Sequence, residues 1–173
     1  MKFFSGFSLI NESYIFEEYL NGSDYSVCGF SYGAIKALRY TLSELEKGNR
    51  IDRLQLLSPA FFQSYDEKFK KLQLISYKKD QELYLKQFLK ACFAPYEKKI
   101  VQNVQTNSEE LEELLNYEWN TSDLEFLANR GVVLEVYLGG KDAIVDARPS
   151  KEFFLEYATV TLVKEANHFL HLN

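Results

Sequence analysis

Hydrophobic and polar positions along the chain predict short strands that alternate with helices. Short apolar runs predict strands over residues 2–5, 25–28, 54–57, 132–138 and 159–163. Apolar positions at helical spacing predict helices over residues 12–20, 34–46 and 150–157. Strands and helices that alternate in this way are typical of a mostly parallel sheet in an α/β fold.

Residues 61–129 interrupt this alternation, because they contain several helical patterns and no convincing strand. Thr106-x-x-Glu109 and Ser122-x-x-Glu125 match the capping box that begins a helix, and Gly131 is a plausible helix end. We therefore predict one domain over residues 1–173, with a mostly parallel sheet of about five strands and a helical cap inserted at about 61–129.

Composition narrows the classes of function. A chain of 173 residues with a net charge of −5 suits one acidic domain and argues against general nucleic-acid binding. No apolar run is long enough for a membrane span, and we interpret the apolar start, residues 1–10, as a strand rather than a signal peptide. Cys28 and Cys92 lack metal-type or C-x-x-C spacing, which indicates a reducing, cytoplasmic compartment. We expect neither a metal nor a cofactor.

The pentapeptide Gly29-Phe30-Ser31-Tyr32-Gly33 lies between a predicted strand and a predicted helix. A G-x-S-x-G in this setting is typical of the nucleophile elbow of α/β-hydrolases, a tight turn that exposes a serine hydroxyl above the sheet. It predicts acyl-transfer chemistry at Ser31. The alternative is that Ser31 only caps the helix that follows.

Two further residues suit a hydrolytic triad with Ser31. Asp142 follows the predicted strand 132–138, and His168 follows the last predicted strand. Carboxyl ends of parallel strands meet at one edge of a sheet, and the order Ser, Asp, His is the one that α/β-hydrolases use. An imidazole can accept the serine proton near neutral pH, and a carboxylate orients the imidazole.

Each of these residues has an alternative. Asp142 suits a turn beside Gly139-Gly140, and Asp146 is a rival acid whose position also suits a helix cap. His171 is the other histidine, and we interpret it as a surface or packing residue.

An oxyanion site needs two backbone N–H donors near the serine. We predict that Tyr32, the residue after the nucleophile, supplies one of them. We predict that Phe7, in the loop 5–8 after the first strand, supplies the other.

Three stretches resemble the signatures of bacterial α/β-hydrolase carboxylesterases. They are Gly29-Phe30-Ser31-Tyr32-Gly33-Ala34, Gly140-Lys141-Asp142-Ala143-Ile144-Val145 and Asn167-His168-Phe169. The opening Phe3-Phe4-Ser5-Gly6-Phe7 resembles their oxyanion segment, with Ser5 where many members have histidine.

The whole chain is similar to the short pimeloyl-acyl-carrier-protein methyl ester esterases of biotin synthesis. That resemblance implies a serine carboxylesterase that cleaves the methyl ester of pimeloyl-acyl carrier protein, with the carrier protein as partner. A thioesterase or a general short-chain carboxylesterase with the same triad is an alternative. A non-catalytic hydrolase-fold protein that binds acyl carrier protein is an alternative of another class.

The chain also departs from the larger esterases it resembles. Two strands before the oxyanion strand, and the strand–helix unit between that strand and the elbow, have no counterpart. The chain ends soon after His168, where those esterases have a final helix. One face of the sheet is therefore expected to be thinly covered, and we expect a partner subunit, as in a homodimer, or the cap to cover it.

The predicted cap has two halves of opposite charge. Residues 61–101 contain nine lysines and five acidic residues, whereas residues 102–130 contain one arginine and seven acidic residues. A basic half could dock an acidic carrier protein by charge complementarity. The candidate lysines are Lys68, Lys70, Lys71, Lys78, Lys79, Lys86 and Lys90. The alternative is two solvated helix faces of opposite sign packed against each other.

Overall fold

A parallel five-stranded sheet forms the centre of the computed structural model, which describes residues 1–173. Its strand order is β1-β3-β4-β6-β7, and every neighbouring pair is parallel, as predicted. The strands are β1 (Lys2–Phe4), β3 (Ser26–Phe30), β4 (Arg53–Leu57), β6 (Val133–Gly139) and β7 (Thr159–Val163). The helices are the 3-10 helix η1 (Glu12–Phe16), α1 (Tyr32–Glu46), α2 (Glu67–Lys79), α3 (Gln81–Phe93), α4 (Ser108–Asn116), α5 (Thr121–Asn129) and α6 (Ala147–Phe154).

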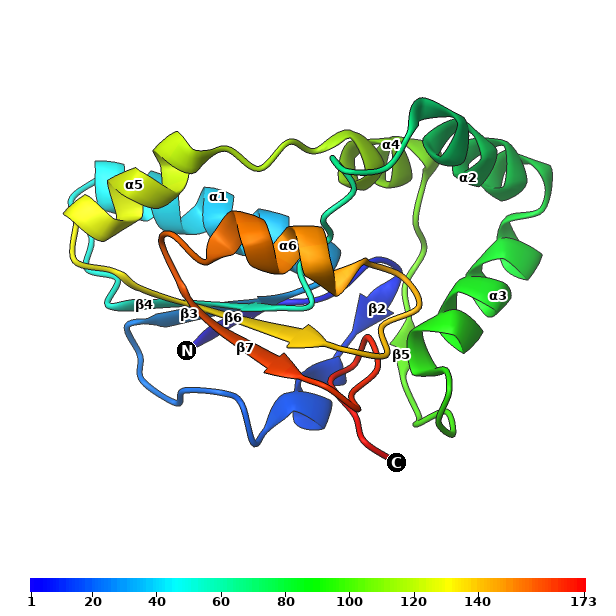
Figure 1. Cartoon of the computed structure of the whole chain (residues 1–173), viewed down its shortest axis with the longest axis horizontal. Coiled ribbons are helices and arrows are strands. Elements are labelled where there is room, and N and C mark those ends of the chain that lie inside the picture. The colour runs from blue at the N-terminus through cyan, green and yellow to red at the C-terminus, as the bar shows by residue number, and fades with distance from the viewer.

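Helices α1, α5 and α6 cover one face of the sheet (Figure 1). Alternate residues of a strand point to the same face, so one set of apolar side chains meets these helices. Val27, Leu54, Leu56, Leu134 and Val136 belong to this set, and they are at most 4% exposed. This layer is the main hydrophobic core.

Short segments from the two ends of the chain cover part of the opposite face. Figure 1 shows η1 and the C-terminal tail below the strands. Here Cys28, Phe30 and Leu57 of the sheet pack in one buried cluster with Phe16 of η1 and Phe169 of the tail. The face that we expected to be thinly covered is thus closed in this part by the chain itself.

The remainder of that face is polar rather than apolar. Gln55 is buried, and its side-chain amide donates to Glu135 (2.9 Å) and to the carbonyl oxygen of Tyr19 (2.8 Å). Glu135 also forms an ion pair with Arg53. Paired polar groups need no apolar cover, so this strip of the sheet does not require the partner that the sequence suggested. A homodimer stays a prediction.

Several predicted elements differ in detail from the structure. The helix predicted over 12–20 is a 3-10 helix over Glu12–Phe16. The segment predicted to lack strands contains β5 (Gln102–Asn103), which pairs antiparallel with β2 (Leu9–Ile10). Two-residue strands carry too little alternation to be detected from sequence.

The helix caps also differ from the predicted ones. The capping box at the start of α4 is Asn107 with Glu110, one residue later than predicted. The box predicted at Ser122 is wrong, because Asn120 caps α5 by accepting from the Asp123 amide. Asn and Ser both suit an N-cap, so spacing alone did not separate them. Gly131, at φ 74°, follows the end of α5, as predicted.

Helices α2, α3 and α4 lie beyond the carboxyl ends of the strands, at the right of Figure 1. We use "cap" below for residues 67–116, which span these helices. Helix α5 lies instead over the sheet (Figure 1), where it contacts β6 and buries Leu124 and Leu127. None of the helices has the length and hydrophobicity needed to cross a bilayer.

Candidate active site

Ser31 lies in a strained turn between β3 and α1. Its φ of 54° and ψ of −116° are unusual for a residue with a side chain, and such conformations cost about 1–3 kcal/mol. The two flanking glycines make the turn possible. A Cβ on Gly29 would lie 2.2 Å from the Gly33 oxygen, and a Cβ on Gly33 would lie 2.0 Å from the Phe4 oxygen. The turn has the geometry expected of a nucleophile elbow.

The structure brings Ser31, His168 and Asp142 into one hydrogen-bonded row. His168 Nε2 is 3.0 Å from Ser31 Oγ, and His168 Nδ1 is 2.6 Å from Asp142 Oδ2. The His168 side chain is fully buried and that of Asp142 is 4% exposed. The three residues come from the loops that follow β3, β6 and β7.

Asp142 is held by the backbone that follows it. Its Oδ1 accepts hydrogen bonds from the amides of Ile144 (2.7 Å) and Val145 (3.0 Å), which leaves Oδ2 for His168. The rival acid Asp146 caps α6 by accepting from the Arg148 amide (3.0 Å). The two carboxylates therefore occupy different places, and Asp142 is the one beside the histidine.

The other histidine lies outside the row. His171 faces Tyr96, with ring centroids 6.5 Å apart. Partial burial, reinforced by the nearby charge of Lys99, lowers the pKa of His171 below its ordinary value. Its position near the end of the tail agrees with a packing role.

Asn167 connects the loop of His168 to the cap. Its side chain donates to the carbonyl oxygen of Phe93, the last residue of α3 (2.8 Å). The same side chain accepts from the amides of Phe169 (3.0 Å) and His171 (3.1 Å). Asn167 itself is fully buried, and these bonds hold the backbone on both sides of His168.

The two backbone amides predicted for the oxyanion site have no acceptor in their own elements. Tyr32 is the first residue of α1, where amides have no intrahelical partner. The Phe7 amide donates to no group of the chain. Their role toward a bound substrate stays a prediction.

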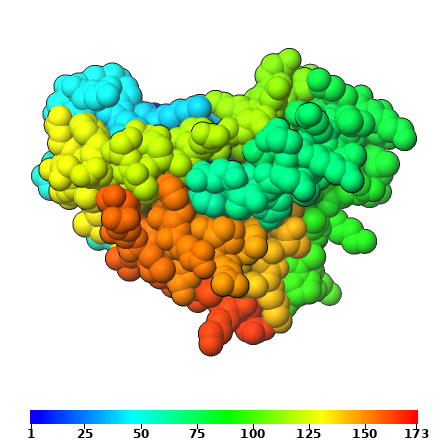
Figure 2. Space-filling model, turned by 45° about the horizontal axis from the view of Figure 1, so that its top comes forward, coloured from blue at the N-terminus to red at the C-terminus, as the bar shows by residue number.

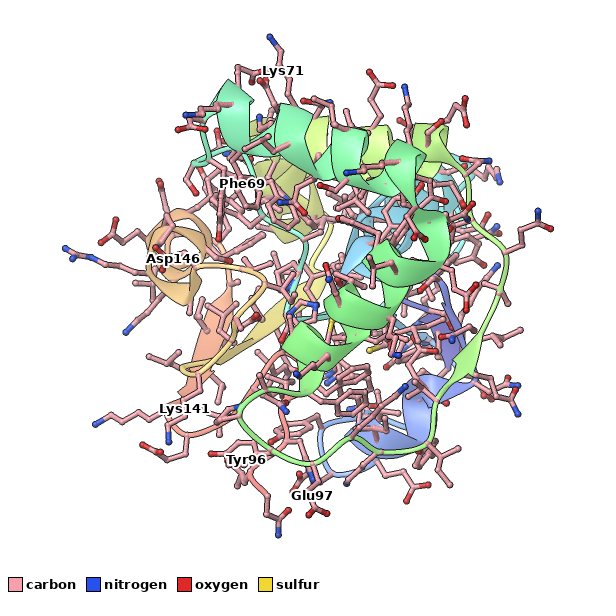
Figure 3. All side chains as sticks on the ribbon, turned by 90° about the vertical axis from the view of Figure 1, so that its right-hand side faces the viewer. Phe69, Lys71, Tyr96, Glu97, Lys141 and Asp146 are labelled. Atoms are coloured by element: carbon pink, nitrogen blue, oxygen red, sulfur yellow. The ribbon has the colours of Figure 1, made fainter.

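A mostly apolar cavity of about 250 Å³ lies between the cap and the Asp142 loop. Its lining residues come from both sides: Phe7, Phe62, Phe69, Gln73, Tyr84, Gln87, Phe88, Ala91, Leu111, Leu114, Leu115, Ala143 and Ile144. Ser31 and His168 do not line it, but Phe7 and Ala143 adjoin the predicted oxyanion site and Asp142. In Figure 3, Phe69 points from α2 toward the interior.

The segment leading into α2 closes one side of this region. Phe61 packs on Phe153 of α6, with ring centroids 5.4 Å apart. The Tyr65 hydroxyl accepts from the Asp146 amide (3.0 Å). Figure 2 shows the teal α2 region in contact with the orange α6 region. The site is therefore covered on this face.

Polar contacts attach helix α4 of the cap to α1, on the side of the site away from α6. Glu113 of α4 accepts a hydrogen bond from the Tyr32 hydroxyl and forms an ion pair with Arg39. Burial raises the pKa of the Glu113 carboxyl, but the bonds from Arg39 and Tyr32 outweigh it, and the pKa lies below its ordinary value. Lys36 and Glu110 form a second pair between these helices (3.8 Å).

The predicted docking lysines do not form one patch. Lys70 is largely buried and pairs with Glu67, whereas Lys71 points outward from α2 (Figure 3). Lys68, Lys78 and Lys79 are also exposed on α2. Lys86 and Lys90 of α3, together with Lys98, line a separate surface hollow of about 370 Å³. Gln87 lines both this hollow and the apolar cavity, so the two adjoin.

No protein-family model matches the sequence, and no curated protein matches it. Solved structures do. An esterase (EaEST) from Exiguobacterium antarcticum matches with TM-score 0.62 and 19% identity over 82% of this chain and 58% of its own. A bromoperoxidase from Bacillus anthracis matches with TM-score 0.62 and 16% identity, over 84% of this chain and 60% of its own. The protein has an α/β-hydrolase fold.

This chain spans less than two thirds of the length of those two proteins. BioG from Haemophilus influenzae differs in this respect. It matches with TM-score 0.55 and 10% identity over 96% of this chain and 87% of its own. A similarly short version of the fold therefore exists in another protein.

Three residues near the site had no individual role predicted from the sequence. Glu12 is buried under the predicted oxyanion loop, Asn167 holds the histidine loop, and Lys98 completes the basic hollow. Only Asn167 had a signal, its place next to His168. Glu12 and Lys98 reach their partners through contacts that no local pattern encodes.

Proposed function

We propose that this protein is a serine carboxylesterase that hydrolyses the methyl ester of pimeloyl-acyl carrier protein. The observation that carries the proposal is the row Ser31 Oγ, His168 Nε2, His168 Nδ1 and Asp142 Oδ2, with separations of 3.0 and 2.6 Å at a strained elbow. This arrangement has the roles and order of a serine-hydrolase triad.

The geometry supports the following reaction. Nε2 of His168 accepts the proton of Ser31 as Oγ attacks the ester carbonyl, and Asp142 stabilises the imidazolium. The amides of Phe7 and Tyr32 stabilise the tetrahedral oxyanion. The intermediate collapses, and the alcohol leaves with the proton from His168. Water then attacks the acyl-enzyme with His168 again as base, and the free acid and Ser31 are restored.

The cavity and the basic hollow support the choice of substrate. The apolar cavity suits an acyl chain, since most of its lining side chains are hydrophobic. The adjoining hollow carries Lys86, Lys90 and Lys98, which suit the acidic surface of a carrier protein or its phosphate-bearing arm. An acyl chain bound in the cavity would lie next to this hollow, because Gln87 lines both.

Labelling by a serine-reactive fluorophosphonate tests the catalytic part. We expect labelling of the wild-type protein and none of Ser31→Ala. Absence of labelling in the folded wild-type protein would refute the proposed serine-hydrolase activity and favour a non-catalytic protein that binds acyl carrier protein.

Matched methyl esters and thioesters, each free and bound to carrier protein, test the substrate. We expect the highest kcat/KM for the carrier-bound methyl ester. A preference for the thioester would instead make the protein a thioesterase, and equal rates on free and bound esters would refute carrier recognition.

Reversing charge at the hollow tests docking. Lys86→Glu with Lys90→Glu should raise KM for the carrier-bound ester and spare a small free ester. Lys47→Glu is the matched control, because Lys47 is exposed at the far end of α1. Equal losses on both substrates, or the same effect from the control, would contradict docking at this hollow.

A further inference from the structure

Glu12 is a carboxyl group buried directly beside the predicted oxyanion loop. It is the first residue of η1 and is fully buried. Its Oε1 accepts a hydrogen bond from the Gly6 amide at 2.7 Å. Its Oε2 has no partner in the chain. Burial of a carboxyl with one oxygen unpartnered is costly, so this position calls for a reason beyond packing.

Two hydrogen bonds hold the peptides on either side of Gly6: the bond to Glu12 holds the peptide between Ser5 and Gly6, and a bond from Leu9 holds the peptide between Gly6 and Phe7. The Gly6 amide donates to Glu12, and the Gly6 carbonyl oxygen accepts from the Leu9 amide at 3.2 Å. The peptide bond is planar and trans, so its C=O and N–H point in opposite directions. With the Gly6 carbonyl directed at Leu9, the Phe7 N–H is directed the other way, where it has no acceptor in the chain.

Without Glu12 the backbone on the N-terminal side of Gly6 would lose its hydrogen bond and be free to rotate. Glycine has access to more backbone conformations than any other residue, and Gly6 lies between β1 and β2 in a loop without regular structure. Glu12 removes that freedom from the N-terminal side of Gly6, and Leu9 removes it from the C-terminal side. The direction of the Phe7 amide then depends on both contacts.

We infer that Glu12 is a positioning residue that aims the Phe7 amide at the oxyanion. The inference rests on the proposed function and goes beyond it, because Glu12 touches neither Ser31 nor a reacting atom. Stabilisation of an oxyanion requires donors placed before the reaction occurs. Loss of Glu12 should therefore weaken binding of the tetrahedral state and leave binding of the ester ground state nearly unchanged.

The test compares Glu12→Ala and Glu12→Gln in the full chain, with p-nitrophenyl butyrate as substrate and a trifluoromethyl ketone as the tetrahedral analogue. Loss of one oxyanion donor costs roughly 10²–10³-fold in kcat. We expect Glu12→Ala to lose at least about tenfold in kcat, with KM within about twofold and analogue affinity reduced in parallel. Glu12→Gln retains an oxygen acceptor for the Gly6 amide and should restore most of kcat.

Thr41→Val is the matched control. Thr41 is also fully buried, and its hydroxyl donates to the Ala37 carbonyl oxygen within α1 (2.8 Å). The Thr41→Val variant therefore shows the effect of losing a buried polar contact away from the oxyanion loop. If Glu12→Ala fails to fold, Glu12→Asp shortens the reach to Gly6 while it keeps the carboxyl, and the same split is expected.

Three results would overturn the inference while the proposed function stands. They are a kcat for Glu12→Ala equal to that of Thr41→Val, a loss confined to KM, and unchanged affinity for the trifluoromethyl ketone. Absence of Ser31-dependent turnover in the wild-type protein would instead refute the proposed function, and this inference with it.

Discussion

Replacing Asn167 by alanine should destabilise the protein strongly, although the side chain is small and polar. The change removes three hydrogen bonds, one to the Phe93 carbonyl oxygen and two from the amides of Phe169 and His171. Alanine can replace none of them. The Phe93 carbonyl and the Phe169 and His171 amides then either lack a hydrogen-bond partner or bind water.

The size of the effect follows from burial. Phe93 and Phe169 are at most 1% exposed, so their backbone groups stay unsatisfied, whereas His171 is partly exposed and water can reach it. Each unsatisfied buried group costs about 1–3 kcal/mol. Two such groups give a loss of about 2–6 kcal/mol. For a domain of this size, the lower part of that range, near 3 kcal/mol, lowers Tm by roughly 6–12 °C.

Urea unfolding measures the free-energy change, and hydrogen exchange at the Phe169 amide locates it. We expect Asn167→Ala to lower the unfolding midpoint and to speed exchange at Phe169. Asn116→Ala is the control, because its exposed side chain makes one comparable bond to the Glu112 carbonyl oxygen (3.0 Å). The control should change stability by less than about 0.5 kcal/mol.

A loss below about 1 kcal/mol for Asn167→Ala would refute this reasoning. It would mean that water or a rearranged backbone satisfies the freed groups. The connection between α3 and the histidine loop would then contribute little.

Three further predictions concern the triad, the cap and the cavity. Asp142→Asn should lower kcat by about 10⁴-fold, because the Asn side chain no longer favours the histidine tautomer that accepts the serine proton. The substitution should cost little stability. Steady-state kinetics measures the change in kcat, and thermal unfolding measures the change in Tm. Glu113→Gln should lower stability by about 0.5–1 kcal/mol at pH 7. The folded pKa of Glu113 lies below its ordinary, unfolded value, so its contribution is present above the unfolded pKa and is lost as the pH falls through the folded pKa. Urea midpoints of variant and wild type should therefore converge in acid, and a constant difference from pH 7 to 3 would contradict the role of Arg39 and Tyr32. Ala91→Phe should partly fill the apolar cavity. It should lower kcat/KM for an octanoyl ester by roughly tenfold and leave kcat/KM for an acetyl ester unchanged. An equal change of kcat/KM for the two esters would exclude this cavity as the acyl site.

Local information in the sequence was sufficient for the elbow and for the parallel sheet. Gly29 and Gly33 flank Ser31 within five residues, and a strand precedes them and a helix follows, so the turn is encoded by neighbours in the chain. Asp142 and His168 could be selected because each follows a strand, and parallel strands bring their carboxyl ends to one edge. Chemistry and chain order together were enough to anticipate the row that the structure brings together.

The tertiary structure alone decided what surrounds that row. Glu12 meets Gly6 and Asn167 meets Phe93 through contacts that leave no periodic pattern in the sequence. The cover of the second sheet face likewise depends on Gln55, Glu135 and the two ends of the chain meeting in space. Hydrophobic periodicity reports which face of an element is buried, but not which distant segment buries it. The three residues of the hydrogen-bonded row could therefore be selected from the sequence, whereas the distant contacts of Glu12 and Asn167 could not.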